Sequence, residues 1–299
     1  MLSVEKQIKD GKLVCPLSRQ PLSFAEGALC TADGNYRYPI VNGVPVLLPE
    51  EQQQAYLAQG QGSMAKEYVG AGKESRIRAW FNGFVNRDYR SEPSRAAFAQ
   101  AINAQPDDAL CVAVGGGPHH VHPKLVNLNI GLFPNVHVVG DAYQLPYADN
   151  AVDAIHCEAV LEHLEFPNEA VREMFRVLRV GGQVFAATPF MQHFHAYPNH
   201  FQNFTLIGHR RLFERAGFEI VSSGVCVGPT YAAWGLVFRY VYTYLTVPGL
   251  RQLFAGAAAA WALLLRPLDI ILNRSPNAHL LASTTYAHAI KRDGVAAKS

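Results

Sequence analysis

The chain has 299 residues, of which 49% are hydrophobic and 17% charged, so it can bury a sizeable core in one large domain or two smaller ones. Its 26 basic and 24 acidic residues give a formal net charge of +2 and form no basic run, which excludes the electrostatic footprint of a nucleic-acid-binding protein. The charged N-terminus lacks the apolar core of a signal peptide, and five cysteines, an odd number, argue against a disulfide framework; we therefore expect a cytoplasmic protein.

The N-terminal third predicts two kinds of structure. Residues 1–50 contain β-rich runs separated by turn signals and predict a small β-rich domain. Residues 51–104 begin as a polar, Gln- and Gly-rich linker and continue with a helical pattern. In that pattern "SRIRAWFNGFV" is amphipathic, and "SRAAFAQAIN" begins with Ser94 as its expected N-cap.

Residues 108–226 alternate predicted strands with helices. The helix "NEAVREMFRVLRVGG" is closed by glycine, and the helix "TLIGHRRLFERAGF" is expected to end at Gly217. This alternation predicts an α/β fold with a parallel sheet. The predicted strands are "ALCVAVGG", "LVNLNI", "VHVVGDA", "AVDAIHCEAV", "GQVFAATPF" and "EIVSSGVCVG".

Residues 230–280 are apolar and predict helices. Their uncharged run, Leu253 to Leu265, has 13 residues, fewer than the roughly 20 that a membrane span needs, so we expect a buried or interfacial helix. By default it is extra core packed on the sheet. It could instead be a lid over an apolar acceptor, a homodimer interface or a membrane-surface contact, the last being least favoured because a strongly basic face is missing.

One segment carries a family resemblance. The stretch "VVGDAYQLPYADNAVDAIHCEAVLEHLEFPNEAVREMFRVLRVGG" resembles the ordered motifs of the class I S-adenosylmethionine-dependent methyltransferases. The resemblance implies a methyltransferase domain over residues 105–299, with a Rossmann-like seven-stranded sheet whose last strand, "STTYAHAIKR", is antiparallel. The apolar residues 230–280 would then be an insertion between the last two strands.

The resemblance also implies a cofactor site for S-adenosylmethionine. Gly115, Gly116 and Gly117 would let the backbone approach the methionine part. The ribose hydroxyls would be held by Asn129, the adenine by Asp141 with the backbone of Ala142, and the sulfonium and amino acid part would lie near Cys157 and Glu158.

The first glycine motif departs from the family pattern. Ala113 stands where the family has an acid, and His119 stands where it has a third glycine. Only 12 positions separate Gly117 from Asn129, and Pro123 discourages a helix between them. Each loss would weaken cofactor binding by about tenfold, so we expect binding that is weaker than usual but real.

Residues 1–50 resemble the small zinc-ribbon-like domain of the activator subunits of tRNA and protein methyltransferases, through "CPLSRQPL" and "YPIVNGVPVLLPEE". A zinc-binding version has two Cys-x-x-Cys pairs. Here Ser18 follows Cys15 and Asp33 follows Cys30 at those positions, so we expect a metal-free domain.

Four histidines lie between positions 193 and 209, after the strand that ends at Pro189. His195 and His200 are the candidate bases for an acceptor hydroxyl, with Tyr197 as an orienting group. A metal site at His193, His195 and His200 is disfavoured because no carboxylate lies nearby in the sequence. We expect His163 to be a helix-start residue bonded to backbone, whereas His119, His120 and His122 either line the cofactor site or are solvated.

These observations favour an enzyme that methylates an oxygen of a small, lipid-linked or glycan-linked acceptor. The alternative is a non-catalytic relative that binds or activates a partner protein, which the altered "AVGGGPHHVHP" motivates.

Overall fold

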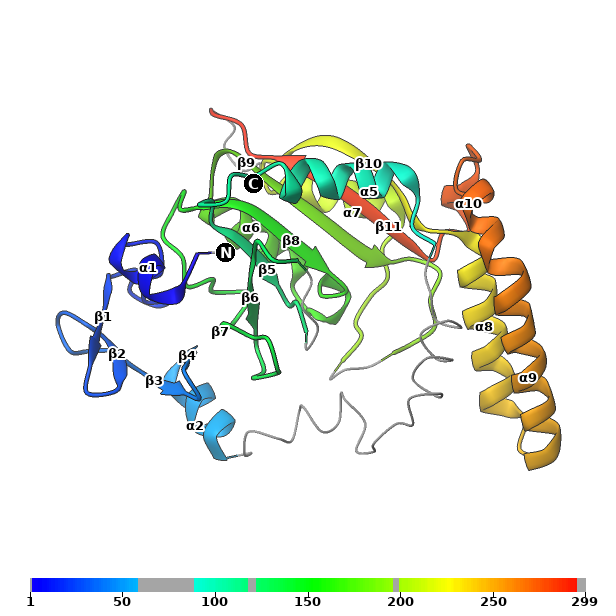
Figure 1. Cartoon of the computed structure of the whole chain (residues 1–299), viewed down its shortest axis with the longest axis horizontal. Coiled ribbons are helices and arrows are strands. Elements are labelled where there is room, and N and C mark those ends of the chain that lie inside the picture. Colours follow the sequence, from blue (N-terminus) through cyan, green and yellow to red (C-terminus); the bar gives the residue numbers. More distant parts are fainter. Residues whose placement is uncertain (1, 59–88, 118–121, 196–198, 295–299) are drawn as a thin grey trace.

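The computed structural model describes residues 2–58, 89–117, 122–195 and 199–294 (Figure 1). The predicted α/β class is confirmed: one large mixed sheet is covered by helices. The strands are β1 (Leu22–Ala25), β2 (Ala28–Thr31), β3 (Arg37–Val41), β4 (Val44–Leu47), β5 (Cys111–Val114), β6 (Leu125–Asn129), β7 (Val138–Gly140), β8 (Val152–Glu158), β9 (Leu178–Pro189), β10 (Glu219–Val227) and β11 (Thr284–Ile290).

The sheet is continuous across the described residues. Its strand order is β1-β2-β3-β4-β7-β6-β5-β8-β9-β11-β10. Strands β7, β6, β5, β8 and β9 are parallel to one another, whereas β11 lies between β9 and β10 and is antiparallel to both. The parallel strands therefore present their carboxyl ends along one edge, where open α/β sheets bind ligands.

Among the described residues, β5 to β11 are the seven strands predicted for residues 105–299, and the N-terminal strands β1 to β4 extend the sheet at its β7 edge to eleven. β4 pairs in parallel with β7, with Val46 opposite Val139 and Leu47 opposite Gly140. The hydrophobic cluster that contains Leu13 and Leu47 also contains Val112 of β5. Residues 1–50 thus share one core with the strands that follow, although the sequence suggests a separate small domain.

Helices cover the sheet and its edge. Side chains of β5 alternate between two hydrophobic cores, Val112 and Val114 in one and Cys111 and Ala113 in the other. The first core is completed by α6 and α7, the second by α5 and the π-helical turn after it. The helices are α1 (Val4–Lys9), α2 (Glu50–Ala58), α5 (Glu92–Phe98), α6 (Pro167–Val177), α7 (Leu206–Arg215), α8 (Pro229–Tyr244), α9 (Pro248–Leu265) and α10 (Asp269–Leu272).

Two predicted helix boundaries are wrong. The helix expected to run through "LRVGG" ends at Val177, and those residues begin β9. The buried amine of Lys291 donates to the carbonyls of Phe175 and Leu178, both at 2.8 Å, which satisfies the end of α6. At α5 the N-cap is Ser91 rather than Ser94, because the Ser91 hydroxyl accepts from the Ser94 amide.

Two further expectations concern glycine and the amphipathic segment. Gly217 follows the end of α7 with φ of +102°, a conformation that glycine adopts without strain, as predicted. The amphipathic "SRIRAWFNGFV" lies outside the described residues.

Residues 229–265 form a helical hairpin, α8 and α9, that extends away from the sheet (Figure 1). Its base is fixed by Asp269, whose carboxylate accepts from the amides of Thr230 and Tyr231. Large apolar side chains are exposed along it, for example Tyr244 (72%) and Leu264 (76%). The default expectation of extra core packed on the sheet is therefore wrong for most of this hairpin.

Among the described residues, no helix has both the length and the hydropathy needed to cross a bilayer.

Candidate functional site

The structure brings most of the predicted cofactor residues to one edge of the sheet. Gly115 follows β5, Asn129 ends β6, Asp141 follows β7 and Glu158 ends β8. These four strands are adjacent and parallel, so their carboxyl ends lie side by side.

The glycine turn after β5 is packed against side chains of the protein. Gly115 has φ of +73°, and an added Cβ would overlap Val160. A Cβ on Gly116 would lie 2.5 Å from Asn127 Oδ1. Asn127 donates from Nδ2 to the Gly117 carbonyl at 3.0 Å, while its Oδ1 is buried and has no hydrogen-bond partner among the described residues.

Asn127 was not among the predicted site residues. A polar residue in the middle of the apolar strand "LVNLNI" is the signal that could have identified it. Its side chain supports the turn that the cofactor would approach, and its unpartnered oxygen could accept one further hydrogen bond.

At the predicted adenosine end, polar groups are positioned by local turns. Asn129 is 8% exposed, and its Oδ1 accepts from the Gly131 amide at 3.0 Å. Asp141 accepts from the Tyr143 amide at 2.9 Å. Burial raises the pKa of Asp141, and hydrogen bonds from the Tyr143 backbone and the Gln52 side chain oppose that rise. Gln52 belongs to α2, so the N-terminal extension contacts the residue predicted to bind adenine.

At the predicted methionine end, Glu158 is already paired. Arg90 holds its carboxylate in a two-pronged ion pair, with Nη1 2.9 Å from Oε2 and Nη2 2.5 Å from Oε1. His156 Nε2 lies 3.3 Å from Oε2. Burial opposes ionisation, but His156 and Arg90 outweigh it and lower the pKa of Glu158 to about 2.

The residues present therefore fit S-adenosylmethionine unevenly. The predicted adenosine end offers Asp141 and Asn129 at strand ends. At the methionine end, the positive groups of the cofactor would have to share Glu158 with Arg90. Cys157 lies in the hydrophobic core and is 1% exposed, so only its backbone remains for a ligand contact, whereas Ala142 is partly buried against the same core.

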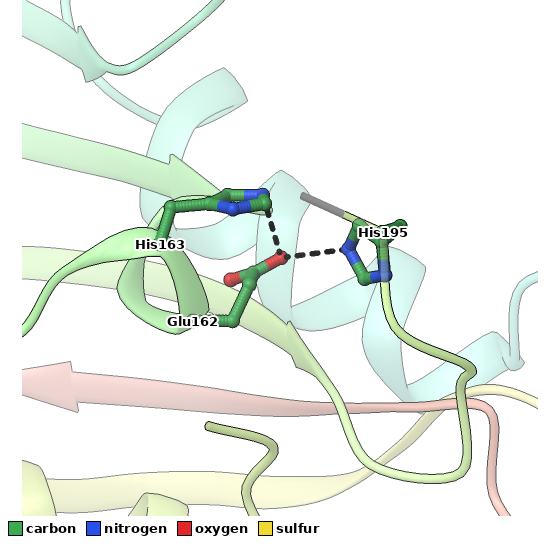
Figure 2. Close-up of side chains that lie close together, drawn as sticks. All are labelled: Glu162, His163 and His195. Carbon is green, nitrogen blue, oxygen red and sulfur yellow. Dashed lines mark ion pairs between the residues drawn. The ribbon is translucent and has the colours of Figure 1, made fainter. Parts of the chain in front are cut away.

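A second cluster lies just beyond Glu158, at the end of the same strand. Glu162 and His163 belong to the 3-10 turn Leu161–His163, and His195 comes from the segment after β9. Glu162 Oε1 lies 3.8 Å from His163 Nε2 and 3.9 Å from His195 Nε2 (Figure 2). Glu162 is fully buried, and its other oxygen accepts from the Thr188 hydroxyl at 3.2 Å.

The histidines of this cluster are oriented by backbone carbonyls. His163 Nδ1 lies 2.5 Å from the Asn199 carbonyl, which bears out the predicted backbone bond, and His195 Nδ1 lies 2.9 Å from the His193 carbonyl. A carbonyl can only accept, so each Nδ1 carries the proton and each Nε2 faces Glu162.

His200 has both ring nitrogens engaged. Its Nδ1 accepts from the His195 amide at 3.1 Å, and its Nε2 donates to Asn203 Oδ1 at 2.7 Å. His200 is thereby placed as a support for the loop that carries His195. Tyr197, His119 and His120 lie outside the described residues, and His122 Nδ1 accepts from the Lys124 amide.

The reason for disfavouring a metal near these histidines was wrong. A carboxylate does lie beside His195, but it comes from Glu162, 33 positions earlier in the chain. Sequence proximity could not reveal it, because the loop after β9 folds back onto the turn after β8. The Phe201 amide donates to the Glu162 carbonyl at 2.8 Å at this contact.

The four ligand-like positions of the N-terminal ribbon make protein contacts. Cys15 Sγ lies 3.0 Å from the Tyr38 hydroxyl and accepts from the Ser18 amide. Hydrogen bonds from Thr31, Asn35 and Gln20 lower the pKa of Asp33 to about 2. The Cys30 thiol lies 3.8 Å from Arg37 Nη1.

A cavity of about 730 Å³ opens beside Arg90, between the start of α5 and α10. Its lining residues include Tyr89, Arg90, Arg95, Ile270 and Arg274. The guanidinium that holds Glu158 is thus also part of this cavity wall.

Comparison with known proteins identifies one part of the chain. A family model described as a methyltransferase domain matches residues 119–186. This match supports the predicted methyltransferase domain in that part of the chain. An uncharacterized chloroplastic methyltransferase of Arabidopsis thaliana is 46% identical over 63 residues, which are 20% of this chain and 18% of that protein.

A second relative, from another protein family, matches over a shorter stretch of the chain. A UPF0434 protein of Caulobacter vibrioides is 46% identical over 44 residues, 14% of this chain and 68% of that protein. Among solved structures, the [4+2]-cyclase SpnF has a TM-score of 0.46 and 16% identity, and the match covers 84% of this chain and 99% of that one. At that score the likeness carries nothing about function.

Proposed function

We propose that this chain, which belongs to the UPF0434 family over one 44-residue segment, transfers a methyl group from S-adenosylmethionine to an oxygen of a small, lipid-linked or glycan-linked acceptor, because it carries a methyltransferase domain. The observation that carries the proposal is the domain match, which runs from position 119 into β9. It includes Asp141, Glu158 and Glu162, the three acids at the carboxyl edge of the sheet.

The cofactor would be held by the residues at the strand ends. Asp141 would accept from the adenine amino group, and Asn129 would bind a ribose hydroxyl. The turn at Gly115–Gly117 would let the backbone lie close to the methionine part. When bound, S-adenosylmethionine supplies an electrophilic methyl group on a sulfonium. The protein's task is to align that methyl with the acceptor oxygen, which is catalysis mainly by positioning.

Glu158 would neutralise positive charge at the methionine end of the cofactor, in competition with Arg90. Its low pKa keeps the carboxylate ionised, but Arg90 offsets that charge. The proposal therefore includes cofactor binding weaker than a free carboxylate would allow.

The acceptor would be received next to His195. Of the three candidates on the acceptor side, His195 has a ring nitrogen directed at a buried carboxylate, and its side chain is 30% exposed. His200 would support the loop, since its nitrogens are engaged by His195 and Asn203. Tyr197 remains a proposed orienting residue from the sequence alone.

A specific observation favours the second candidate function, a non-catalytic protein that binds or activates a partner. Arg90 occupies the carboxylate expected to contact the cofactor's methionine end, and Ala113 stands where the family has an acid. Loss of both acidic contacts is what a relative without methyl transfer would show.

Cofactor binding separates the two functions. We expect calorimetry to detect micromolar binding of S-adenosylmethionine and S-adenosylhomocysteine to the full chain, weakened about 10-fold to 100-fold in Asp141→Ala. The matched control is Asp108→Ala, an exposed acid in the turn before β5. No heat at millimolar cofactor, with a folded protein, would refute methyl transfer and favour the partner-binding function.

A further inference from the structure

The cluster of Glu162, His163 and His195 has more acceptor atoms than donors. Glu162 Oε1 is buried and has no hydrogen-bond partner among the described residues. Both neighbouring imidazoles carry their proton on Nδ1, where a carbonyl accepts it, so each turns an Nε2 lone pair toward the same space. Three ligand atoms converge there, and in their neutral form the two histidines supply no hydrogen between them.

The distances fit a missing cation better than direct hydrogen bonds. The two gaps of 3.8 and 3.9 Å exceed the 2.7–3.2 Å range of N–H···O bonds. With metal–ligand bonds of 2.0–2.2 Å, two ligand atoms on a tetrahedral centre lie roughly 3.4 Å apart. The three ligand atoms all lie within 4.8 Å of one another, so small side-chain rotations would complete the geometry.

The groups behind these three side chains are arranged as in metal sites. The Nδ1 of each histidine donates to a backbone carbonyl, which fixes ring orientation and tautomer. Glu162 is held through Oε2 by Thr188, the penultimate residue of β9. Its Oε1 is left for a ligand.

Burial strengthens the case for a cation. Glu162 is fully buried, and an ionised carboxylate in such a place is costly unless a positive charge compensates it. Arg239 lies nearby, but its guanidinium contacts His193 Nε2 at 3.0 Å rather than the carboxylate.

We propose that Glu162, His163 and His195 bind a divalent transition-metal ion. Two imidazoles and one carboxylate form the ligand set of open zinc and non-haem iron sites, and Zn²⁺ is the probe we commit to. Because the protein supplies three ligands, at least one coordination position stays open. An acceptor oxygen in that position would lose its proton more readily. This last role rests on the proposed function, whereas the metal site itself does not.

The test is metal binding by the full chain in the absence of S-adenosylmethionine. Chelator-treated, tag-free protein is titrated with Zn²⁺ by calorimetry and with Co²⁺ by visible absorption. We expect one ion per chain and a Co²⁺ spectrum without thiolate bands. Glu162→Gln, His163→Ala and His195→Ala should each weaken Zn²⁺ binding by about 100-fold or more, since outer-shell losses alone cost 10–100-fold.

The matched control is His193→Ala. It removes a histidine from the same loop but keeps the backbone carbonyl that holds His195 Nδ1. Its Zn²⁺ affinity should stay within about threefold of the wild type. A Cys15→Ser, Cys30→Ser double variant should also keep the site.

Three results would overturn the proposal: no stoichiometric Zn²⁺ binding at micromolar ion, equal loss in His193→Ala, or loss confined to the cysteine variant. His195→Ala is the variant least expected to disturb folding, because this side chain is 30% exposed. Circular dichroism checks that each variant is folded. Calorimetry with S-adenosylmethionine measures cofactor binding separately from Zn²⁺ binding. The proposed methyl transfer and the proposed metal site can therefore fail independently.

Discussion

Glu158 and Glu162 lie four positions apart at the end of one strand, yet their surroundings are opposite. Glu158 has both oxygens bound, by Arg90 and His156, and burial does not prevent its ionisation. Glu162 is more deeply buried and leaves one oxygen facing two histidine lone pairs. An acid that the protein itself satisfies stabilises the fold, whereas an acid left unsatisfied indicates a place for a ligand.

The largest effect on stability is expected from removing Arg90. Arg90→Leu leaves the Glu158 carboxylate with only His156, and we expect the free energy of unfolding to fall by about 2 kcal/mol. The figure is kept low because Arg90 is 34% exposed and solvent screens the pair. Urea unfolding at neutral pH measures it.

The same variant should bind S-adenosylmethionine more tightly, by about threefold to tenfold, because the cofactor's positive groups no longer share Glu158. Arg95→Leu, at an exposed arginine of α5 five positions after Arg90, is the control and should change neither quantity. If cofactor affinity falls instead, Arg90 is a cofactor ligand and not a competitor.

Isosteric substitution of each acid by glutamine should affect the free energy of unfolding differently. Glu158→Gln removes the charge that Arg90 needs, and we expect a loss of about 1–2 kcal/mol of unfolding free energy. Glu162→Gln replaces a buried carboxyl whose Oε1 has no hydrogen-bond partner among the described residues, and it provides an amide that can donate to the histidine Nε2 atoms. Without metal it should be neutral or stabilising by about 1 kcal/mol.

Thermal and urea unfolding of both variants, after treatment with chelator, measure this difference. A destabilised Glu162→Gln would mean that one of the histidines carries a second proton and already neutralises Glu162. The contrast between the two acids would then disappear.

The sequence could predict one of these environments and not the other. Gly115, Asn129, Asp141 and Glu158 all follow strand ends, and parallel strands place those ends together whatever the details of packing. Local patterning is enough to bring such residues to one edge. It also marks Asn127, a polar residue in an apolar strand.

Contacts between distant segments could not be predicted in this way. Arg90 reaches Glu158 across 68 positions, and His195 reaches Glu162 across 33. Both partners come from segments outside the strand pattern, where spacing carries no information about which residues meet. The same limit explains why β4 was not expected to extend the sheet beside β7.

Composition alone was also insufficient for the apolar residues near the C-terminus. Their run of apolar letters predicts helices, which form, but it does not say whether those helices pack on the sheet. The base of the hairpin is tied to the rest of the protein by Asp269, which accepts from the amides of Thr230 and Tyr231.

The smallest expected effect is a change in acid sensitivity. The pKa of Glu158 is lowered from 4.5 to about 2, so the unfolded chain binds this proton more readily than the native protein. The stability that Glu158 contributes is therefore complete above about pH 4.5 and is lost as the pH falls toward about 2. Urea unfolding at about pH 5.5 and about pH 3.5 should show the stability gap between wild type and Glu158→Gln narrowing by about 1 kcal/mol at the lower pH. Glu158 is 28% exposed, which keeps this effect modest. A gap that stays constant or widens on acidification would show that Arg90 does not hold the carboxylate in its ionised form.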